Sequence, residues 1–204
     1  MNIAVTGGIG SGKSKVMQLL NTLGYPSFSC DEIYKEIAQS LEYVQEIARI
    51  FPSCVQDNCL DRKQLSQIIF TSDKARAQLN AISHPLIMER LLSKMQNCNA
   101  RFVFAEVPLL FEGKFEKYFD FVIVVQRDLN QRISAIKSRD NLTEKEIYNR
   151  IQSQIDYTSK DIQNYFKEKG FYILENNSDI QTLKNQLQNI INLIENKPTV
   201  KHIS

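Results

Sequence analysis

A glycine-rich run near the start of the chain has the residue types and the spacing that bind phosphate groups. Residues 7–14 read GGIGSGKS and match the pattern G-x-x-x-x-G-K-[ST], with Gly7 and Gly12 as its fixed glycines. Glycine lets the backbone adopt positive φ values, so that several N–H groups can converge on anionic oxygens. In such a loop Lys13 reaches the terminal phosphates of a nucleotide, and the Ser14 hydroxyl completes the coordination of Mg²⁺. The pattern therefore predicts a phosphate site for a nucleotide.

The segments on either side of this run are those that a phosphate-binding loop requires. An apolar run at residues 3–5 indicates a strand before it, and apolar residues at helical spacing follow it, namely Val16, Leu19, Leu20 and Leu23. The helix that begins near Lys13 directs the positive end of its dipole at the anion. Four of the seven glycines lie between positions 7 and 12, and so much backbone freedom costs folding entropy unless the loop binds something. These features disfavour a chance match and a glycine turn without a ligand.

Strand-like segments alternate with long segments of helical periodicity along the chain. We expect five strands, at residues 3–6, 25–29, 102–105, 121–125 and 171–174. Residues 32–98 have helical periodicity and no convincing strand, and residues 180–195 form a last helix with one apolar face. The sequence therefore predicts an α/β fold in which helices wrap a parallel five-stranded sheet.

Composition excludes several classes of function. The chain has 204 residues, of which 43% are hydrophobic and 24% charged, and its net charge is +2. So small a charge gives no field for binding nucleic acid or an anionic membrane. No apolar run approaches the ~20 residues that span a bilayer, and no signal sequence precedes the first strand. We therefore expect a cytoplasmic protein that acts on small molecules as a monomer or weak homo-oligomer, with no nucleic acid and no membrane as partners.

The cysteines and histidines indicate neither disulfides nor a zinc site. The four cysteines form no CxxC pair, and a phosphate loop argues for a reducing compartment, so we expect free thiols. With only two histidines in the chain, the ligand spacing of a zinc site is missing.

Two long segments favour a small-molecule kinase over other nucleotide-binding proteins. The helical stretch 32–98 is too long for a simple crossover and can bind a second substrate, and the charged segment 127–160 can act as a lid that excludes water. The N-K-x-D motif with which Ras-like GTPases read guanine is absent, and motors usually need larger chains. Two alternatives stay open: a kinase of another nucleotide-like acceptor, and a switch protein that hydrolyses ATP slowly.

Further motifs resemble those of the dephospho-CoA kinases and occur in one order along the chain. They are TGGIGSGKS at 6–14, DEI at 31–33, LDR at 60–62, HPLI at 84–87, VPLLFE at 107–112, RD at 139–140, R-I-x-x-Q at 150–154 and NN at 176–177. HPLI and VPLLFE are far more specific than the phosphate loop. The resemblance, which runs from residue 1 to about residue 187, implies a P-loop kinase fold with a helical insert and a lid. It also implies that the γ-phosphoryl group of ATP, bound with Mg²⁺, is transferred to the 3′-hydroxyl of dephospho-CoA.

The resemblance implies a division of the chain into parts. The nucleotide-binding core comprises residues 1–31, 99–130 and 161–196, the helical insert for the CoA substrate residues 32–98, the lid residues 131–160 and a tail residues 197–204. ATP is expected on one continuous run of the phosphate loop, formed by Gly10, Ser11, Gly12, Lys13, Ser14 and Lys15.

Asp31 follows the second expected strand, at the edge where open α/β sheets bind ligands. Its carboxylate can accept the proton of an attacking ribose hydroxyl, or it can cap the helix that begins near Glu32. Spacing alone favours neither role. The resemblance, in which an aspartate at this position is the candidate base, favours catalysis and contact with the acceptor. The family often has a second aspartate two residues earlier, where this chain has Ser29.

The acidic residues near the third expected strand are candidates for metal binding. Glu106 ends that strand, where phosphate-loop proteins often hold Mg²⁺ through water, so Ser14 and Glu106 are the expected metal residues. An ordinary strand-end carboxylate is an equal alternative, and Glu112 is a second candidate acid. Pro108, in the VPLLFE run, is expected to contact the acceptor.

Two residues of the helical stretch 32–98 are candidate contacts for the acceptor. The resemblance places the HPLI run beside the CoA pocket, which makes His84 one candidate. Arg62, in the LDR motif, is the other. The favoured alternative for His84 is a buried, hydrogen-bonded imidazole at a helix break before Pro85. An exposed surface charge is the alternative for Arg62.

Arg139 is the expected catalytic residue of the lid, because a guanidinium can clamp two oxygens of the transferring phosphoryl group. The family often has another arginine four residues earlier, where this chain has Ala135, so Arg132 or Lys137 is the candidate substitute. Asn176, beyond the last strand, is expected to contact the adenine, and its alternative is a turn residue.

Overall fold

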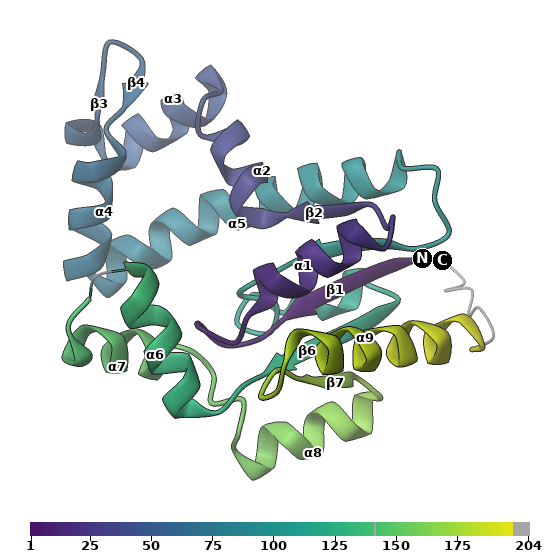
Figure 1. Cartoon of the computed structure of the whole chain (residues 1–204). Coiled ribbons are helices and arrows are strands. Elements are labelled where there is room, and N and C mark those ends of the chain that lie inside the picture. The colour runs from purple at the N-terminus through teal and green to yellow at the C-terminus, as the bar shows by residue number, and fades with distance from the viewer. Residues whose placement is uncertain (141, 198–204) are drawn as a thin grey trace. The chain divides into compact units, whose positions relative to one another are not determined.

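The computed structural model describes residues 1–140 and 142–197, and Figure 1 shows its helices and strands. Of the expected tail, residues 198–204 lie outside the described part. No helix among the described residues is both long enough and apolar enough to cross a bilayer. The four cysteines form no disulfide bond with one another, as the sequence predicts.

Most of a five-stranded sheet belongs to the first of two compact units, which comprises Met1–Ser27 and Ala100–Ser204. The strand order is β2-β5-β1-β6-β7, with β1 parallel to both β5 and β6, and β6 parallel to β7. The strands are β1 (Asn2–Thr6), β2 (Ser27–Ser29), β5 (Val103–Glu106), β6 (Phe121–Gln126) and β7 (Tyr172–Glu175). The predicted five-stranded α/β architecture is therefore confirmed, with strand ends that differ from the expected ones by one or two residues.

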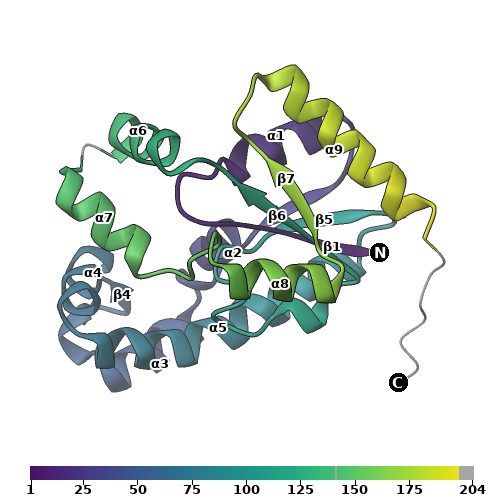
Figure 2. The same ribbon diagram turned by 90° about the horizontal axis from the view of Figure 1, so that it is seen from below.

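The apolar strands are buried on both faces, because helices of the first unit cover each side of the sheet. Figure 2 shows α1 (Lys13–Thr22) and α9 (Ile180–Glu195) on one face and α8 (Lys160–Lys169) on the other. Alternate residues of β1 and β6 join α1 and α9 in one core, which is the period of two expected of strands. On the α8 side Phe111 packs against four aromatic rings, with centroids 5.1–6.2 Å away, those of Tyr157, Tyr165, Phe166 and Phe171.

The segment expected to form a lid contains α6 (Leu129–Asp140) and α7 (Glu144–Gln152). A capping box begins α7: the Thr143 hydroxyl accepts from the Glu146 N–H, and the Glu146 carboxylate accepts from the Thr143 N–H. Local residues thus define where this helix begins.

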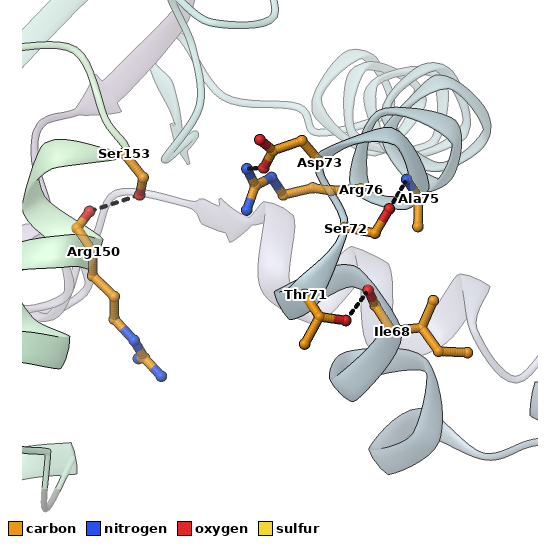
Figure 3. A network of polar contacts seen from close by, with 8 residues as sticks. All are labelled: Ile68, Thr71, Ser72, Asp73, Ala75, Arg76, Arg150 and Ser153. Carbon is orange, nitrogen blue, oxygen red and sulfur yellow. Dashed lines mark hydrogen bonds and ion pairs between the residues drawn. The ribbon is translucent and has the colours of Figure 1, made fainter.

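The second unit, Phe28–Asn99, is mainly helical. Its elements are α2 (Cys30–Ile37), α3 (Leu41–Ile50), β3 (Val55–Gln56), β4 (Cys59–Leu60), α4 (Arg62–Thr71) and α5 (Asp73–Gln96), with a short 3₁₀ turn, η1 (Pro52–Cys54). Side chains at the four helix N-caps accept backbone N–H groups, and they belong to Ser29, Ser40, Asp61 and Ser72. Figure 3 shows Ser72 bonded to the Ala75 N–H and the ion pair between Asp73 and Arg76 in the first turn of α5.

The expectation that residues 32–98 hold no strand is wrong in one place. β3 and β4 form a short antiparallel hairpin, joined by Asp57 and Asn58 at φ values of 52° and 58°. Positive φ at both central residues is typical of the two-residue hairpin turn whose twist matches that of the strands. Aspartate and asparagine tolerate this conformation better than most residues. The Asp-Asn pair was the available signal in the sequence.

The expected helix break before Pro85 is also wrong, because α5 runs through that proline. A proline inside a helix removes one hydrogen bond and costs ~3 kcal/mol. The helix buries residues on both sides of it, including Leu79 and Met88, and the Ser83 hydroxyl lies 2.8 Å from the Tyr43 hydroxyl. Packing along 24 residues offsets the local cost.

Candidate active site

The glycine-rich run forms the turn between β1 and α1 at the carboxyl edge of the sheet. β1 ends at Thr6, and α1 begins at Lys13 with Gly12 as its N-cap in a left-handed conformation, φ 94°. A Cβ atom on Gly12 would lie 2.1 Å from the Asn176 amide nitrogen, so a glycine is required for both its conformation and the close approach. The loop therefore presents backbone at the N-terminus of a helix, which is the geometry that binds phosphate.

The Lys13 side chain folds back over this loop. Its Nζ donates to the Gly7 carbonyl at 2.9 Å and to the Gly8 carbonyl at 3.3 Å. Ser14 and Lys15, the next two residues of α1, are exposed. The ammonium group thus lies over the loop in which the sequence pattern predicts the terminal phosphates of a nucleotide, and Ser14 is exposed beside it.

Asn176 holds the loop from behind. It is 3% exposed, its N–H donates to the Gln126 carbonyl, and its side-chain amide donates to the Ser11 carbonyl at 2.8 Å. This support of the loop was not foreseen, because the two residues are 165 positions apart. Contact between Asn176 and adenine stays a prediction.

Asp31 lies in the first turn of α2, in the second unit, with its side chain exposed. It is not the N-cap, and that alternative is wrong: the cap is Ser29, whose hydroxyl accepts from the Asp31 N–H at 3.2 Å. Ser29, where the family often has aspartate, thus fixes the start of the helix. The Asp31 carboxylate is consequently not used in capping.

Glu106, the acidic candidate for metal binding, lies at the carboxyl end of β5, beside the carboxyl end of β1. Glu106 is the last residue of β5 and pairs in register with Val5 of β1, one residue before that strand ends. Pro108 follows two residues later. Glu112 is exposed, and its carboxylate accepts from the Ile155 N–H at 3.3 Å. The described residues contain no group of three or more metal-ligating side chains, so a metal ion here would need ligands from the nucleotide.

Arg139, at the end of α6, is exposed and forms two hydrogen bonds to the neighbouring Asp140 carboxylate, at 2.6 and 2.8 Å. The Arg150 guanidinium of α7 lies 3.7 Å from the same carboxylate. The hydrogen bond from Arg139, aided by the charge of Arg150, lowers the pKa of Asp140. Of the candidate substitutes for the missing arginine at Ala135, Lys137 pairs with Glu144 at 3.3 Å.

The other candidate, Arg132, lies against the phosphate loop. It is 8% exposed, and its Nε donates to the Ile9 carbonyl at 2.9 Å. The Ile9 N–H donates at 2.6 Å to the side-chain oxygen of Gln154, a residue that the sequence analysis singled out only as part of a motif. No signal of spacing relates Ile9 to residues 123 and 145 positions away.

The remaining predicted contacts, Arg62 and His84, belong to the second unit. Arg62 is the first residue of α4, exposed, with one nitrogen 3.4 Å from the Lys35 carbonyl. His84 is half-buried within α5, and burial lowers the pKa of its imidazole. A cavity of about 530 Å³ in this unit has four glutamates and one arginine in its lining, which does not suit a polyanionic ligand.

The chain is similar to known proteins in sequence and in structure. A family model described as dephospho-CoA kinase matches residues 1–182. The chain is 33% identical to a dephospho-CoA kinase of Rickettsia bellii over 195 residues, covering 95% of this chain and 97% of that one. It is 30% identical to a dephospho-CoA kinase of Thermus thermophilus over 189 residues, covering 93% and 89%.

The solved structures that this chain resembles also include a dephospho-CoA kinase. The dephospho-CoA kinase from Campylobacter jejuni superposes with a TM-score of 0.66 at 29% identity, covering 95% of this chain and 96% of that one. TT1252 from Thermus thermophilus superposes with a TM-score of 0.79 at 29% identity, covering 97% and 98%. Shikimate kinase from Acinetobacter baumannii, at 15% identity and a TM-score of 0.51 over 95% of this chain and 92% of that one, shares the fold alone. The predicted P-loop kinase fold is confirmed.

Proposed function

We propose the chemistry of the site on the premise that this chain belongs to the dephospho-CoA kinase family. In this proposal ATP binds on Gly10–Lys15, and its γ-phosphoryl group is transferred to the 3′-hydroxyl of dephospho-CoA. The observation that supports this most directly is the glycine-lined turn at the N-terminus of α1 with the Lys13 ammonium folded over it. Phosphoryl transfer needs little covalent chemistry from a protein. Catalysis by this family of folds is therefore mostly positioning and neutralisation of charge.

Positive charge at the transferring group comes from this chain's own residues. Lys13 is already placed over the loop, and exchange of its carbonyl partners for phosphate oxygens gives charge-assisted hydrogen bonds in place of neutral ones. Arg139 is the second cation in the proposal. It must leave Asp140 to reach a phosphate. Because the Arg139 side chain is largely exposed and the Arg150 guanidinium stays near the same carboxylate, this exchange costs little.

The residues present fit Mg²⁺ bound together with the nucleotide. Mg²⁺ keeps several waters and takes one or two protein ligands besides phosphate oxygens, which agrees with an open Ser14 hydroxyl and no larger ligand cluster among the described residues. Ser14 would hold the ion directly and Glu106 through water. When bound, the ion neutralises charge on the β- and γ-phosphates.

Asp31 is proposed to receive or orient the proton of the acceptor hydroxyl. Its exposed carboxylate lies in the first turn of α2 and is not used in capping that helix. Arg62, His84 and Pro108 remain proposed contacts for the acceptor. The cytoplasmic location and the monomeric or weakly associated state expected from the sequence also remain part of the proposal.

The 3′-deoxy analogue of dephospho-CoA tests the proposed acceptor atom. With Mg²⁺ and ATP, the protein is expected to phosphorylate dephospho-CoA but to give no phosphorylated product from the analogue, because the attacking oxygen is missing. The analogue should still inhibit the reaction competitively. A phosphorylated analogue would contradict transfer to the 3′-hydroxyl and would favour another nucleotide-like acceptor site.

A further inference from the structure

One residue of the phosphate loop, Ile9, is held at both of its backbone polar groups by two side chains, one from α6 and one from the segment just after α7. The Ile9 N–H donates to the Gln154 side-chain oxygen at 2.6 Å, and the Arg132 Nε donates to the Ile9 carbonyl at 2.9 Å. Loop peptides in a phosphate site are free to rotate, because glycines flank them. The two hydrogen bonds fix the orientation of the two consecutive peptide units that meet at the Ile9 Cα.

The Arg132 guanidinium is buried without an ion pair to a described carboxylate. It is 8% exposed, and its one hydrogen bond among the described residues is to the neutral Ile9 carbonyl. Burial lowers the pKa of Arg132, partly offset by the charge of Asp156. A buried guanidinium that no ion pair fully compensates is costly to keep, so its charge indicates an anionic ligand.

The position of this cation indicates which part of the ligand it serves. A Cβ atom on Gly8 would lie 2.6 Å from a terminal nitrogen of Arg132, so the guanidinium lies directly against that residue. The Lys13 ammonium lies 3.3 Å from the carbonyl oxygen of the same Gly8. The two cations thus flank one residue, and the lysine marks the place of the terminal phosphates.

We propose that Arg132 and Gln154 are positioning residues that clamp the backbone of Ile9 at its carbonyl and its N–H, and that Arg132 thereby brings its charge to the terminal phosphate of ATP. This inference rests on the proposed ATP site but not on the identity of the acceptor. It makes the loop's ATP-binding shape depend on one residue of α6 and on one residue just after α7. It also requires ATP, with its third phosphate, to gain more from the clamp than ADP does.

Three measurements without any acceptor test the clamp. Hydrogen exchange at the Ile9 amide is expected to accelerate at least about tenfold in Gln154→Leu, because the acceptor is lost. Calorimetric titration of Arg132→Met with ATP should show affinity reduced by about 10- to 100-fold, the effect of one charge-assisted contact. Affinity for ADP should change less than about threefold. The matched control is Arg101→Met, an exposed arginine paired with Glu195 before β5, which should alter none of these.

Gly8→Ala provides a second route to the same answer. The added methyl would displace the flexible end of Arg132 without removing its charge or placing strain on the backbone, since the φ of Gly8 is not positive. Alone, this substitution should weaken ATP binding about as much as Arg132→Met does, and in the Arg132→Met background it should have no further effect.

The outcomes separate the clamp from a purely structural role and from the proposed function. Unchanged Ile9 exchange in Gln154→Leu, equal losses for ATP and ADP, or full additivity of Gly8→Ala with Arg132→Met would each overturn the clamp. All these readouts are taken on binding, so failure to phosphorylate dephospho-CoA would leave them intact. If Arg132→Met does not fold, the Gly8→Ala titration with ATP and ADP decides alone.

Discussion

Replacement of Lys13 by methionine is expected to lower kcat/KM for phosphoryl transfer by about a thousandfold. Methionine keeps the length and apolar stem of the side chain but removes the ammonium that lies over the Gly7 and Gly8 carbonyls. Preorganised positive charge at the transferring group is the largest contribution that such a site makes to its rate. Steady-state kinetics with ATP and dephospho-CoA measure the loss.

The control for that variant is Lys167→Met, which removes a lysine from the exposed face of α8. It should keep the rate within about twofold. Both variants should unfold within a few degrees of the unchanged protein, because the half-buried Lys13 side chain bonds loop carbonyl groups and is not part of the apolar core. A Lys13→Met rate within about tenfold of the unchanged protein would contradict the assignment of this lysine.

Asp31→Asn is expected to lower the rate of transfer at least about a hundredfold while ATP affinity stays nearly intact. The amide keeps the shape of the side chain but cannot accept the proton of the attacking hydroxyl. Because Ser29 rather than Asp31 caps α2, the helix start should survive the substitution. Rates of single turnover, compared with calorimetric ATP affinity, separate the two effects.

Glu32→Gln is the matched control, since Glu32 lies in the same first turn of α2 and is also exposed. Each substitution removes one negative charge from the amino end of this helix, at a cost of about 0.3–1 kcal/mol in stability. If only this general charge mattered, the two variants would lose activity equally. Near-normal turnover in Asp31→Asn would contradict the assignment of Asp31 as the base. It would mean that the loose transition state of phosphoryl transfer does not require removal of the hydroxyl proton by this residue.

Local patterns in the sequence were sufficient for the sheet and for the phosphate loop. Apolar runs such as 121–125 predict buried strands because helices cover both faces, and the GGIGSGKS run predicts its own turn because glycine positions decide its geometry. The helix at 180–195 was also found at its observed ends, because its apolar face is regular.

Contacts between distant positions could not be predicted in the same way. The supports of the phosphate loop come from Arg132, Gln154 and Asn176, which lie 123 to 165 positions beyond the residues they contact. Pro85 shows the opposite failure: a strong local signal for a helix break was overridden by packing on both sides of it. Ser29 took the capping role that local chemistry allowed equally to Asp31.

The account is tested most directly by mass spectrometry of a single reaction. Purified protein is incubated with Mg²⁺ and ATP, with and without dephospho-CoA, and CoA and ADP are quantified over time. We predict CoA and ADP in equal amounts, with little ADP when dephospho-CoA is omitted, because a lid that excludes water protects ATP from hydrolysis. ADP formation at the same rate with and without dephospho-CoA, and no CoA, would contradict the kinase assignment and leave only a nucleotide-binding loop.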